Sequence, residues 1–199
     1  MDINVINHYD TLIDEDNDPV HDPEPLKEYM DKWDGDQFIS KMNLTKRSSV
    51  LEIGVGTGRL AVRTAPLCGS FCGIDVSLKT VERAEENLKD CGNVSLVCGD
   101  FLSYDFLRSF DVIYSSLTFM HIKDKQAAMD KAAALLSDGG KFVLSIDKNQ
   151  DEYIDTGTSK IKIYPDTPKD ITSYIENTKM RIDEISETEL AYIFVCTKA

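Results

Sequence analysis

The stretch from Ser48 to Ala61, SSVLEIGVGTGRLA, constrains the fold of this chain more than any other part of the sequence. Its apolar run at residues 50–53 is long enough for a buried strand and too short for a helix. A helix-compatible run over residues 59–65 begins directly after three alternating glycines, Gly54, Gly56 and Gly58. A strand, a glycine-rich turn and a helix begin a βα nucleotide-binding unit, because backbone without Cβ atoms can approach a ligand that the helix N–H groups then face.

Two acidic residues near the glycine turn indicate which chemical class of ligand it binds. Glu52 stands inside the strand, two positions before Gly54, where a carboxylate would repel the pyrophosphate of a dinucleotide and attract a cationic group. Asp75 lies near the end of the apolar run at residues 71–76, about twenty residues beyond the glycines, where an acid can accept two hydrogen bonds from a ribose diol. Val76 follows and is placed to lie against an adenine face.

Periodicity predicts alternating strands and helices over the rest of the chain. We expect further strands at residues 71–76, 94–97, 110–116, 141–146, 181–187 and 190–198, and helices at residues 78–89, 124–136 and 169–179. Ser77 is the expected N-cap of the first of these helices. Two short helices are expected before the first strand, and the prolines of residues 1–25 argue against a long helix there. The polar residues 149–168 are expected to form a substrate-facing insertion.

The pattern E-x-G-x-G-x-G at residues 52–58 resembles the first motif of the class I S-adenosylmethionine-dependent methyltransferases, of the small-molecule, type 11/25-like kind. The resemblance covers residues 36–199 and implies an α/β fold. The expected fold is a Rossmann-like seven-stranded sheet in the order 3-2-1-4-5-7-6, with the last strand antiparallel, helices on both faces and an N-terminal helical cap. Residues 1–35 match nothing in the family pattern and are expected to form a separate acidic arm or cap.

The resemblance also implies a cofactor and the residues that bind it. Asp100 and Phe101 follow the third expected strand, where the family has an acid that accepts from the adenine amino group and a residue that packs on the ring. Ser115 lies at the end of the fourth expected strand, where the reactive methyl group sits. The expected cofactor is S-adenosylmethionine, leaving as S-adenosylhomocysteine. Its site is expected to comprise Glu52, Gly54, Gly56, Thr57, Gly58, Asp75, Val76, Asp100, Phe101 and Ser115.

Methyl transfer from a sulfonium is an in-line displacement that needs no metal and no covalent intermediate. The protein holds the acceptor near attack distance and excludes water. An amine acceptor needs only to lose its proton to solvent, whereas a hydroxyl or a carbon acid needs a base. The candidate bases are Tyr9 and His121, the latter within the TFMHI segment at residues 118–122. In the family, a histidine at this place is also found as a structural or substrate-orienting residue.

Charge and cysteine usage limit the partners. The formal net charge is −13, and residues 1–36 hold twelve acidic residues against two lysines. This arm is either a solvated segment or a lid that favours a cationic acceptor, and it argues against nucleic acid and anionic membranes as partners. We therefore expect a small-molecule acceptor. Five cysteines without zinc-site spacing, and the lack of a secretory signal, predict a cytoplasmic protein. A monomer and a homodimer both stay open.

Two alternatives compete with the methyltransferase. Residues 56–61 satisfy the G-x-G-x-x-A pattern of an NAD(P)-dependent oxidoreductase, and Asp75 would also serve a ribose there. Glu52, the closing strands and the absence of a Y-x-x-x-K pair argue against that class. The second alternative is a module that binds the cofactor without catalysis. Val55 departs from the small residues or cysteine usual at its place in the family, although it does not abolish the turn.

Overall fold

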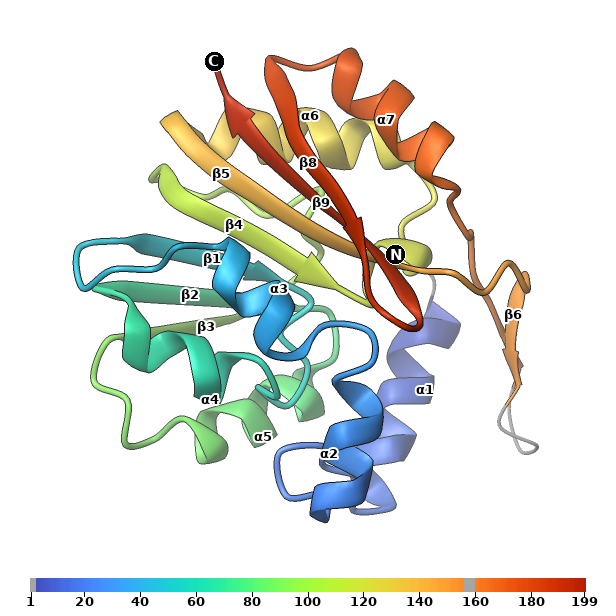
Figure 1. The fold of residues 1–199 in the computed structure, drawn as a ribbon. Helices are drawn as coiled ribbons and strands as arrows, with labels where there is room; N and C mark the ends of the chain where they lie inside the picture. Colours follow the sequence, from blue (N-terminus) through green and yellow to red (C-terminus); the bar gives the residue numbers. More distant parts are fainter. Residues whose placement is uncertain (1–2, 156–159) are drawn as a thin grey trace.

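The computed structural model describes residues 3–155 and 160–199, and its centre is a seven-stranded mixed sheet (Figure 1). The strand order is β3-β2-β1-β4-β5-β9-β8. The strands are β1 (Ser49–Ile53), β2 (Ser70–Asp75), β3 (Val94–Cys98), β4 (Phe110–Ser116), β5 (Leu136–Asp147), β8 (Met180–Glu187) and β9 (Ala191–Lys198). Strands β1 to β5 pair in parallel, whereas β9 is antiparallel to both β5 and β8.

Counted within this sheet alone, the order is the predicted 3-2-1-4-5-7-6, and the last strand is antiparallel as expected. The labels differ because β6 (Tyr153–Asp155) and β7 (Lys160–Lys162) pair with each other in a separate two-stranded sheet. This small sheet lies in the predicted polar insertion, of which residues 156–159 lie outside the described part of the chain. Strand β5 begins five residues earlier than predicted, because Leu136 already pairs with Phe110 before a register shift in β4.

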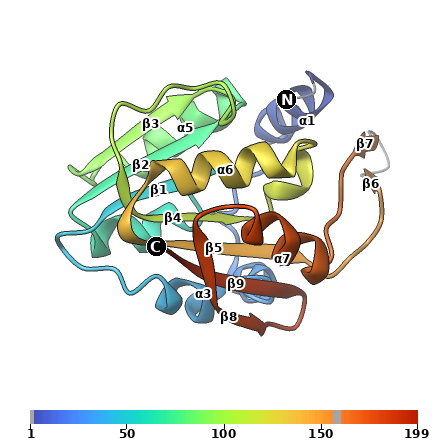
Figure 2. The ribbon, with the colours of Figure 1, turned by 90° about the horizontal axis from the view of Figure 1, so that it is seen from above.

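Helices cover both faces of the sheet (Figures 1 and 2). One face packs against α6 (Lys125–Leu135) and α7 (Pro168–Glu176), and the other packs against α3 (Gly35–Lys41) and α4 (Ala61–Thr64). Alternation along β1 and β4 sorts their side chains between these two cores. Val50 and Tyr114 face α3 and α4, while Leu51 and Ile113 face α6 and α7. Glu52 therefore lies on the same face as Tyr114.

Local sequence signals explain where the helices begin and end. Helix α5 (Leu78–Asn87) begins at Ser77, whose Oγ accepts from the Thr80 N–H at 3.1 Å, as predicted from the N-cap. Helix α7 begins at a capping box of Thr167 and Asp170. Helix α4 is shorter than the predicted run, because Pro66 follows and the chain continues as the 3-10 helix η1 (Ala65–Leu67).

The N-terminal region contains the main error in the predicted fold. Helix α1 (Ile3–Asp14) is twelve residues long, although the prolines of residues 1–25 were expected to prevent a long helix. The prolines begin only at Pro19, so they follow the helix instead of interrupting it. The two short helices expected before β1 are present as α2 (Glu24–Met30) and α3. Within residues 3–155 and 160–199, no helix is long and apolar enough to cross a membrane.

Candidate active site

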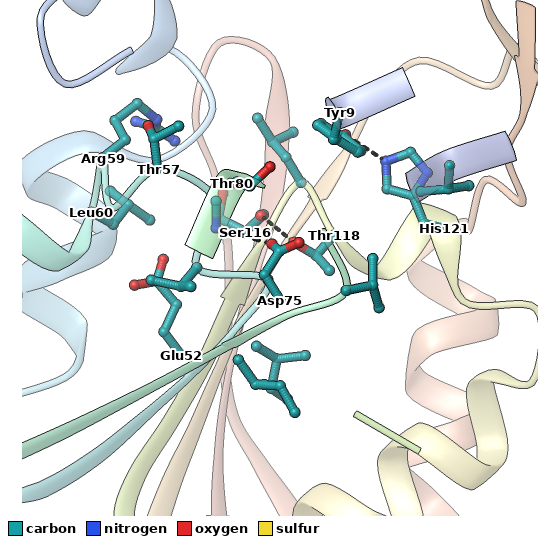
Figure 3. Close-up of a pocket in the computed structure, with 18 of the residues that line it drawn as sticks. Tyr9, Glu52, Thr57, Arg59, Leu60, Asp75, Thr80, Ser116, Thr118 and His121 are labelled. Carbon is teal, nitrogen blue, oxygen red and sulfur yellow. Dashed lines mark hydrogen bonds between the residues drawn. The ribbon is translucent and has the colours of Figure 1, made fainter. Parts of the chain in front are cut away.

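A cavity of about 240 Å³ opens at the carboxyl ends of β1, β2 and β4, with α1 forming one of its walls (Figure 3). Parallel strands of an open α/β sheet bind ligands at this end. Figure 3 shows Glu52 and Arg59 on one side, Tyr9 and His121 on the other, and Asp75 between them. The predicted site residues that line the cavity are Tyr9, Glu52, Gly54, Gly56, Thr57, Asp75, Val76, Phe101 and His121.

The glycine turn forms the floor of the cavity, and each of its three glycines is required for a different structural reason. All three have positive φ, at +78° for Gly54, +56° for Gly56 and +96° for Gly58. A Cβ on Gly54 would lie 2.0 Å from the Thr118 Oγ1, whereas one on Gly56 would enter open space. A Cβ on Gly58 would lie 3.3 Å from Leu88, so this glycine allows close packing and does not line the cavity. Gly56 is the position at which a ligand can approach bare backbone.

Val55, which departs from the family pattern, has a packing explanation. Its side chain is buried, and a Cβ on Gly73 of β2 would lie 2.8 Å from it. The branched side chain therefore fills the space that Gly73 leaves on the neighbouring strand. The turn keeps its shape with a larger residue at this position.

Glu52 is a buried carboxyl group at the floor of the cavity. It is 3 % exposed, and the Tyr114 Oη donates a hydrogen bond of 2.7 Å to its Oε2. Burial raises the pKa of Glu52 to about 8, against a smaller opposing effect of the Tyr114 hydrogen bond. The carboxyl is therefore mostly protonated at neutral pH. A cationic group bound beside it would favour the ionised form.

Arg59, Asp34 and Ser116 form a hydrogen-bond network that sequence reasoning missed. The Arg59 guanidinium donates to both carboxylate oxygens of Asp34, at 2.9 and 2.5 Å, and the Ser116 Oγ donates to the same carboxylate at 2.7 Å. The Asp34 side chain is fully buried, whereas Arg59 and Ser116 line the cavity. The network joins the segment before α3 to the residues after the glycine turn. An arginine directly after the third glycine is the one local signal that points to it.

Asp75 lies at the tip of β2, in the same cavity as Glu52. Its Oδ2 accepts from the Gly56 N–H at 3.0 Å, and its Oδ1 accepts from the Ser77 N–H at 3.1 Å. Burial raises the pKa of Asp75, against these backbone hydrogen bonds, which lower it. The carboxylate therefore also fixes the glycine turn.

Besides Gly58, two predicted residues lie beside the cavity without lining it. The Asp100 carboxylate accepts from the Leu102 N–H at 2.9 Å, while its neighbours Gly99 and Phe101 line the cavity. The Ser115 Oγ donates to the Ile53 carbonyl at 2.8 Å, and Ser116 lines the cavity in its place. The difference at β4 follows from the two-residue period of a strand, since Ser116 shares the face of Glu52 and Ser115 does not.

Tyr9 and His121 form a pair on the far side of the cavity. The Tyr9 Oη and the His121 Nε2 are hydrogen-bonded at 2.8 Å. His121 is 6 % exposed, and its Nδ1 has no hydrogen-bond partner among the described residues. Burial lowers the pKa of His121 to about 4 and raises that of Tyr9, so both groups are neutral at pH 7. The pair joins α1 to the 3-10 turn η2 (Phe119–His121).

A second cavity of about 360 Å³ lies next to the first, and the two share Leu117. Leu117 has a φ of +56°, which is unusual for a branched side chain. The described residues that line the second cavity include four acids and no basic side chain; the acids are Asp147, Asp151, Asp155 and Asp166. This cavity opens beside β6, in the predicted insertion.

Helix α1 and the loop that follows it are held against α5 by acidic side chains. The Ser77 Oγ donates to Asp10 at 2.6 Å, and Lys79 pairs with Asp14 at 2.6 Å. Arg83 lies 3.2 Å from Asp16. The acids of the N-terminal arm therefore face basic and hydroxyl groups of α5, and α1 contributes Tyr9 to the cavity from this position.

Comparison with known proteins agrees with this fold. Residues 50–140 match the family model described as a methyltransferase domain. An uncharacterized methyltransferase of Anoxybacillus flavithermus is 36 % identical over 123 residues, covering 60 % of this chain and 57 % of that relative. One from Bacillus mycoides is 38 % identical over 109 residues, covering 53 % and 50 %. The chain thus spans about half the length of the curated relatives it matches.

Solved structures share the fold at low sequence identity. The N-methyltransferase NodS of Bradyrhizobium japonicum, in complex with S-adenosyl-L-homocysteine, superposes with a TM-score of 0.72 at 15 % identity, covering 98 % of each chain. A methyltransferase of Clostridium acetobutylicum gives 0.69 at 18 % identity, covering 96 % of each. The architecture is thus that of the class I methyltransferases. Residues 50–140 thus match a methyltransferase domain, and the chain shares the fold of S-adenosylmethionine-dependent methyltransferases, in agreement with the resemblance seen in the sequence.

Proposed function

We propose that this chain transfers a methyl group from S-adenosylmethionine to a small-molecule acceptor by in-line displacement. The observation that carries the proposal is one cavity that combines the open backbone of Gly56, the buried carboxyl of Glu52 and the strand-tip carboxylate of Asp75. NodS, which shares the fold, holds the demethylated form of this cofactor. A dinucleotide would bring an anionic pyrophosphate to the glycine turn and would gain nothing from the Glu52 charge, whereas the ammonium of S-adenosylmethionine would stabilise the ionised carboxyl; this difference disfavours the oxidoreductase alternative.

The residues present fit the chemical groups of this cofactor. Asp75 can accept from the ribose hydroxyls, and Val76, Gly99 and Phe101 offer apolar surface to the adenine. Arg59 offers a cation to the carboxylate of the amino-acid end, and Glu52 offers an acid to its ammonium. For Asp100 to meet the adenine amino group, its carboxylate would share or give up the hydrogen bond from Leu102. When bound, the cofactor supplies an electrophilic methyl group.

Tyr9 and His121 are the proposed catalytic residues. The neutral imidazole can accept a proton, and the hydrogen bond between the Tyr9 Oη and the His121 Nε2 orients both rings. A hydroxyl acceptor would need this base. An amine acceptor would need the pair only to orient its lone pair and to exclude water.

The acceptor is proposed to be a small neutral or cationic molecule, such as an amine, that reaches the first cavity by way of the second. The acids of the second cavity favour such a molecule over an anionic one. The one Lys or Arg side chain among the described residues that line the first cavity, Arg59, is paired with Asp34 and is assigned to the cofactor carboxylate, so it is not left for an anionic acceptor. The same charges disfavour nucleic acid. We further propose a cytoplasmic protein that acts as a monomer or homodimer, its five cysteines being free thiols.

Binding and turnover test the proposal separately. Calorimetry should show uptake of S-adenosylhomocysteine and none of NADH. Labelled S-adenosylmethionine, incubated with a panel of amines and hydroxyl compounds, should transfer its label to at least one of them. Tight binding of NADH in place of S-adenosylhomocysteine would contradict the assignment. Cofactor binding without transfer to any member of a broad panel would favour the non-catalytic module.

A further inference from the structure

A buried lysine outside the first cavity has hydrogen-bond partners that connect it to the Tyr9–His121 pair. Lys125 is the first residue of α6 and is 4 % exposed. Its Nζ donates to the Phe119 carbonyl at 2.8 Å and to the Tyr164 carbonyl at 2.7 Å, and it also pairs with the Asp166 carboxylate. An ammonium group has three N–H donors, so each of them has an acceptor.

These acceptors come from two segments that are far apart in the sequence. Phe119 opens the η2 turn that carries His121, while Tyr164 and Asp166 follow β7. The Tyr164 N–H also donates to the Met120 carbonyl at 2.7 Å, so the two segments are joined directly as well as through the lysine. Met120 and Asp166 line the second cavity. Lys125 therefore connects the turn of His121 to the wall of that cavity.

We propose that Lys125 is a positioning residue, which holds the η2 turn so that His121 stays in hydrogen-bond contact with Tyr9 while the second cavity keeps its wall. The inference rests on the proposed function, since it is the proposed catalytic pair that Lys125 positions. A stabilising role alone does not require this ion pair, because apolar residues of similar volume often replace a buried ion pair at little cost. The positive charge of Lys125 also helps to lower the pKa of His121 and keep the imidazole neutral.

The test compares Lys125→Met with a matched variant, Lys198→Met. Lys198 also donates to backbone carbonyls at one end of α6, at 2.6 Å to Leu136, and it lies outside both cavities. The readouts are the His121 titration by NMR of the imidazole C–H signals, the affinity for S-adenosylhomocysteine, and kcat as a function of pH with the best acceptor found. Only the last readout depends on turnover.

Lys125→Met should raise the pKa of His121 measurably and lower kcat at least tenfold, with cofactor affinity within about twofold of wild type. Lys198→Met should change none of the three. A Lys125→Met protein with the wild-type His121 titration and wild-type kcat would overturn the inference. If that variant does not fold, the double variant Lys125→Met/Asp166→Leu also removes the unpaired acid. The same changes in the His121 pKa, kcat and cofactor affinity are expected of it, and the same result would overturn the inference. If wild type shows no methyl transfer, the proposed function fails, while the NMR titration still decides whether Lys125 controls His121.

Discussion

The buried Glu52 should make cofactor binding depend strongly on pH. Its pKa of about 8 without a bound cation leaves about 10 % of the carboxyl ionised at pH 7 and about 1 % at pH 6. If the cofactor binds the ionised form through its ammonium group, each pH unit below 8 costs about 1.4 kcal/mol of binding free energy. The Kd of S-adenosylhomocysteine should therefore rise about 90-fold between pH 9 and pH 6, with protons released on binding at pH 7.

The assay is calorimetry at four pH values between 6 and 9, in two buffers of different ionisation enthalpy. Glu52→Gln is the matched control, because the amide keeps the size of the side chain and an acceptor oxygen for the Tyr114 hydroxyl without titrating. It should bind with a nearly constant Kd over this range, since any titration of the ligand itself is common to both proteins. A wild-type Kd that stays flat from pH 6 to pH 9, or a Glu52→Gln slope equal to that of wild type, would refute the reasoning.

Three further predictions concern Asp75, Tyr9 and Arg59. Asp75→Asn, which keeps one acceptor oxygen, should weaken binding of S-adenosylhomocysteine by about 1–3 kcal/mol in calorimetry; unchanged affinity would exclude the ribose contact. Tyr9→Phe removes the hydrogen bond to His121 and should lower kcat about tenfold or more while cofactor affinity stays within about twofold; equal loss of both would show that the hydroxyl acts on the cofactor. Arg59→Met leaves the buried carboxylate of its partner unpaired and should lower the free energy of unfolding by about 3–5 kcal/mol in urea titrations, whereas a loss below about 1 kcal/mol would mean that solvent reaches that carboxylate.

The sheet and the glycine turn could be predicted because their signals are local. A short apolar run ends at three spaced glycines, and each later strand is bounded by turn residues or a helix cap such as Ser77. The alternation of side chains on β1 follows from the same pattern. It places Glu52 and Leu51 on opposite faces of the sheet. These elements depend on neighbours in the sequence, which is the information that periodicity contains.

The parts of the site that could not be predicted depend on contacts between distant residues. Nothing near Asp34 in the sequence indicates that its carboxylate will accept from Arg59 and Ser116. The choice between Ser115 and Ser116 depends on the register of β4, where a shift of one residue exchanges the two faces of the strand. The alternation of Val112, Tyr114 and Ser116 places these three residues on one face of β4. That face can be assigned to the cavity only once the face that Glu52 occupies on β1 is known.

The structure also changes the reason for expecting a neutral or cationic acceptor. The sequence argument relied on the acidic arm, but Asp14 and Asp16 pair with Lys79 and Arg83 of α5 and cannot select an acceptor by unpaired charge. Such exposed pairs contribute only about 0–1 kcal/mol each, so they orient α1 more than they stabilise it. The charge that an acceptor would meet is that of acids in the second cavity such as Asp147 and Asp151, which are hydrogen-bonded to amide groups of Asn149. Replacing an acid of that cavity, such as Asp151, should therefore raise the KM for an amine acceptor, whereas Asp14→Asn should leave it unchanged.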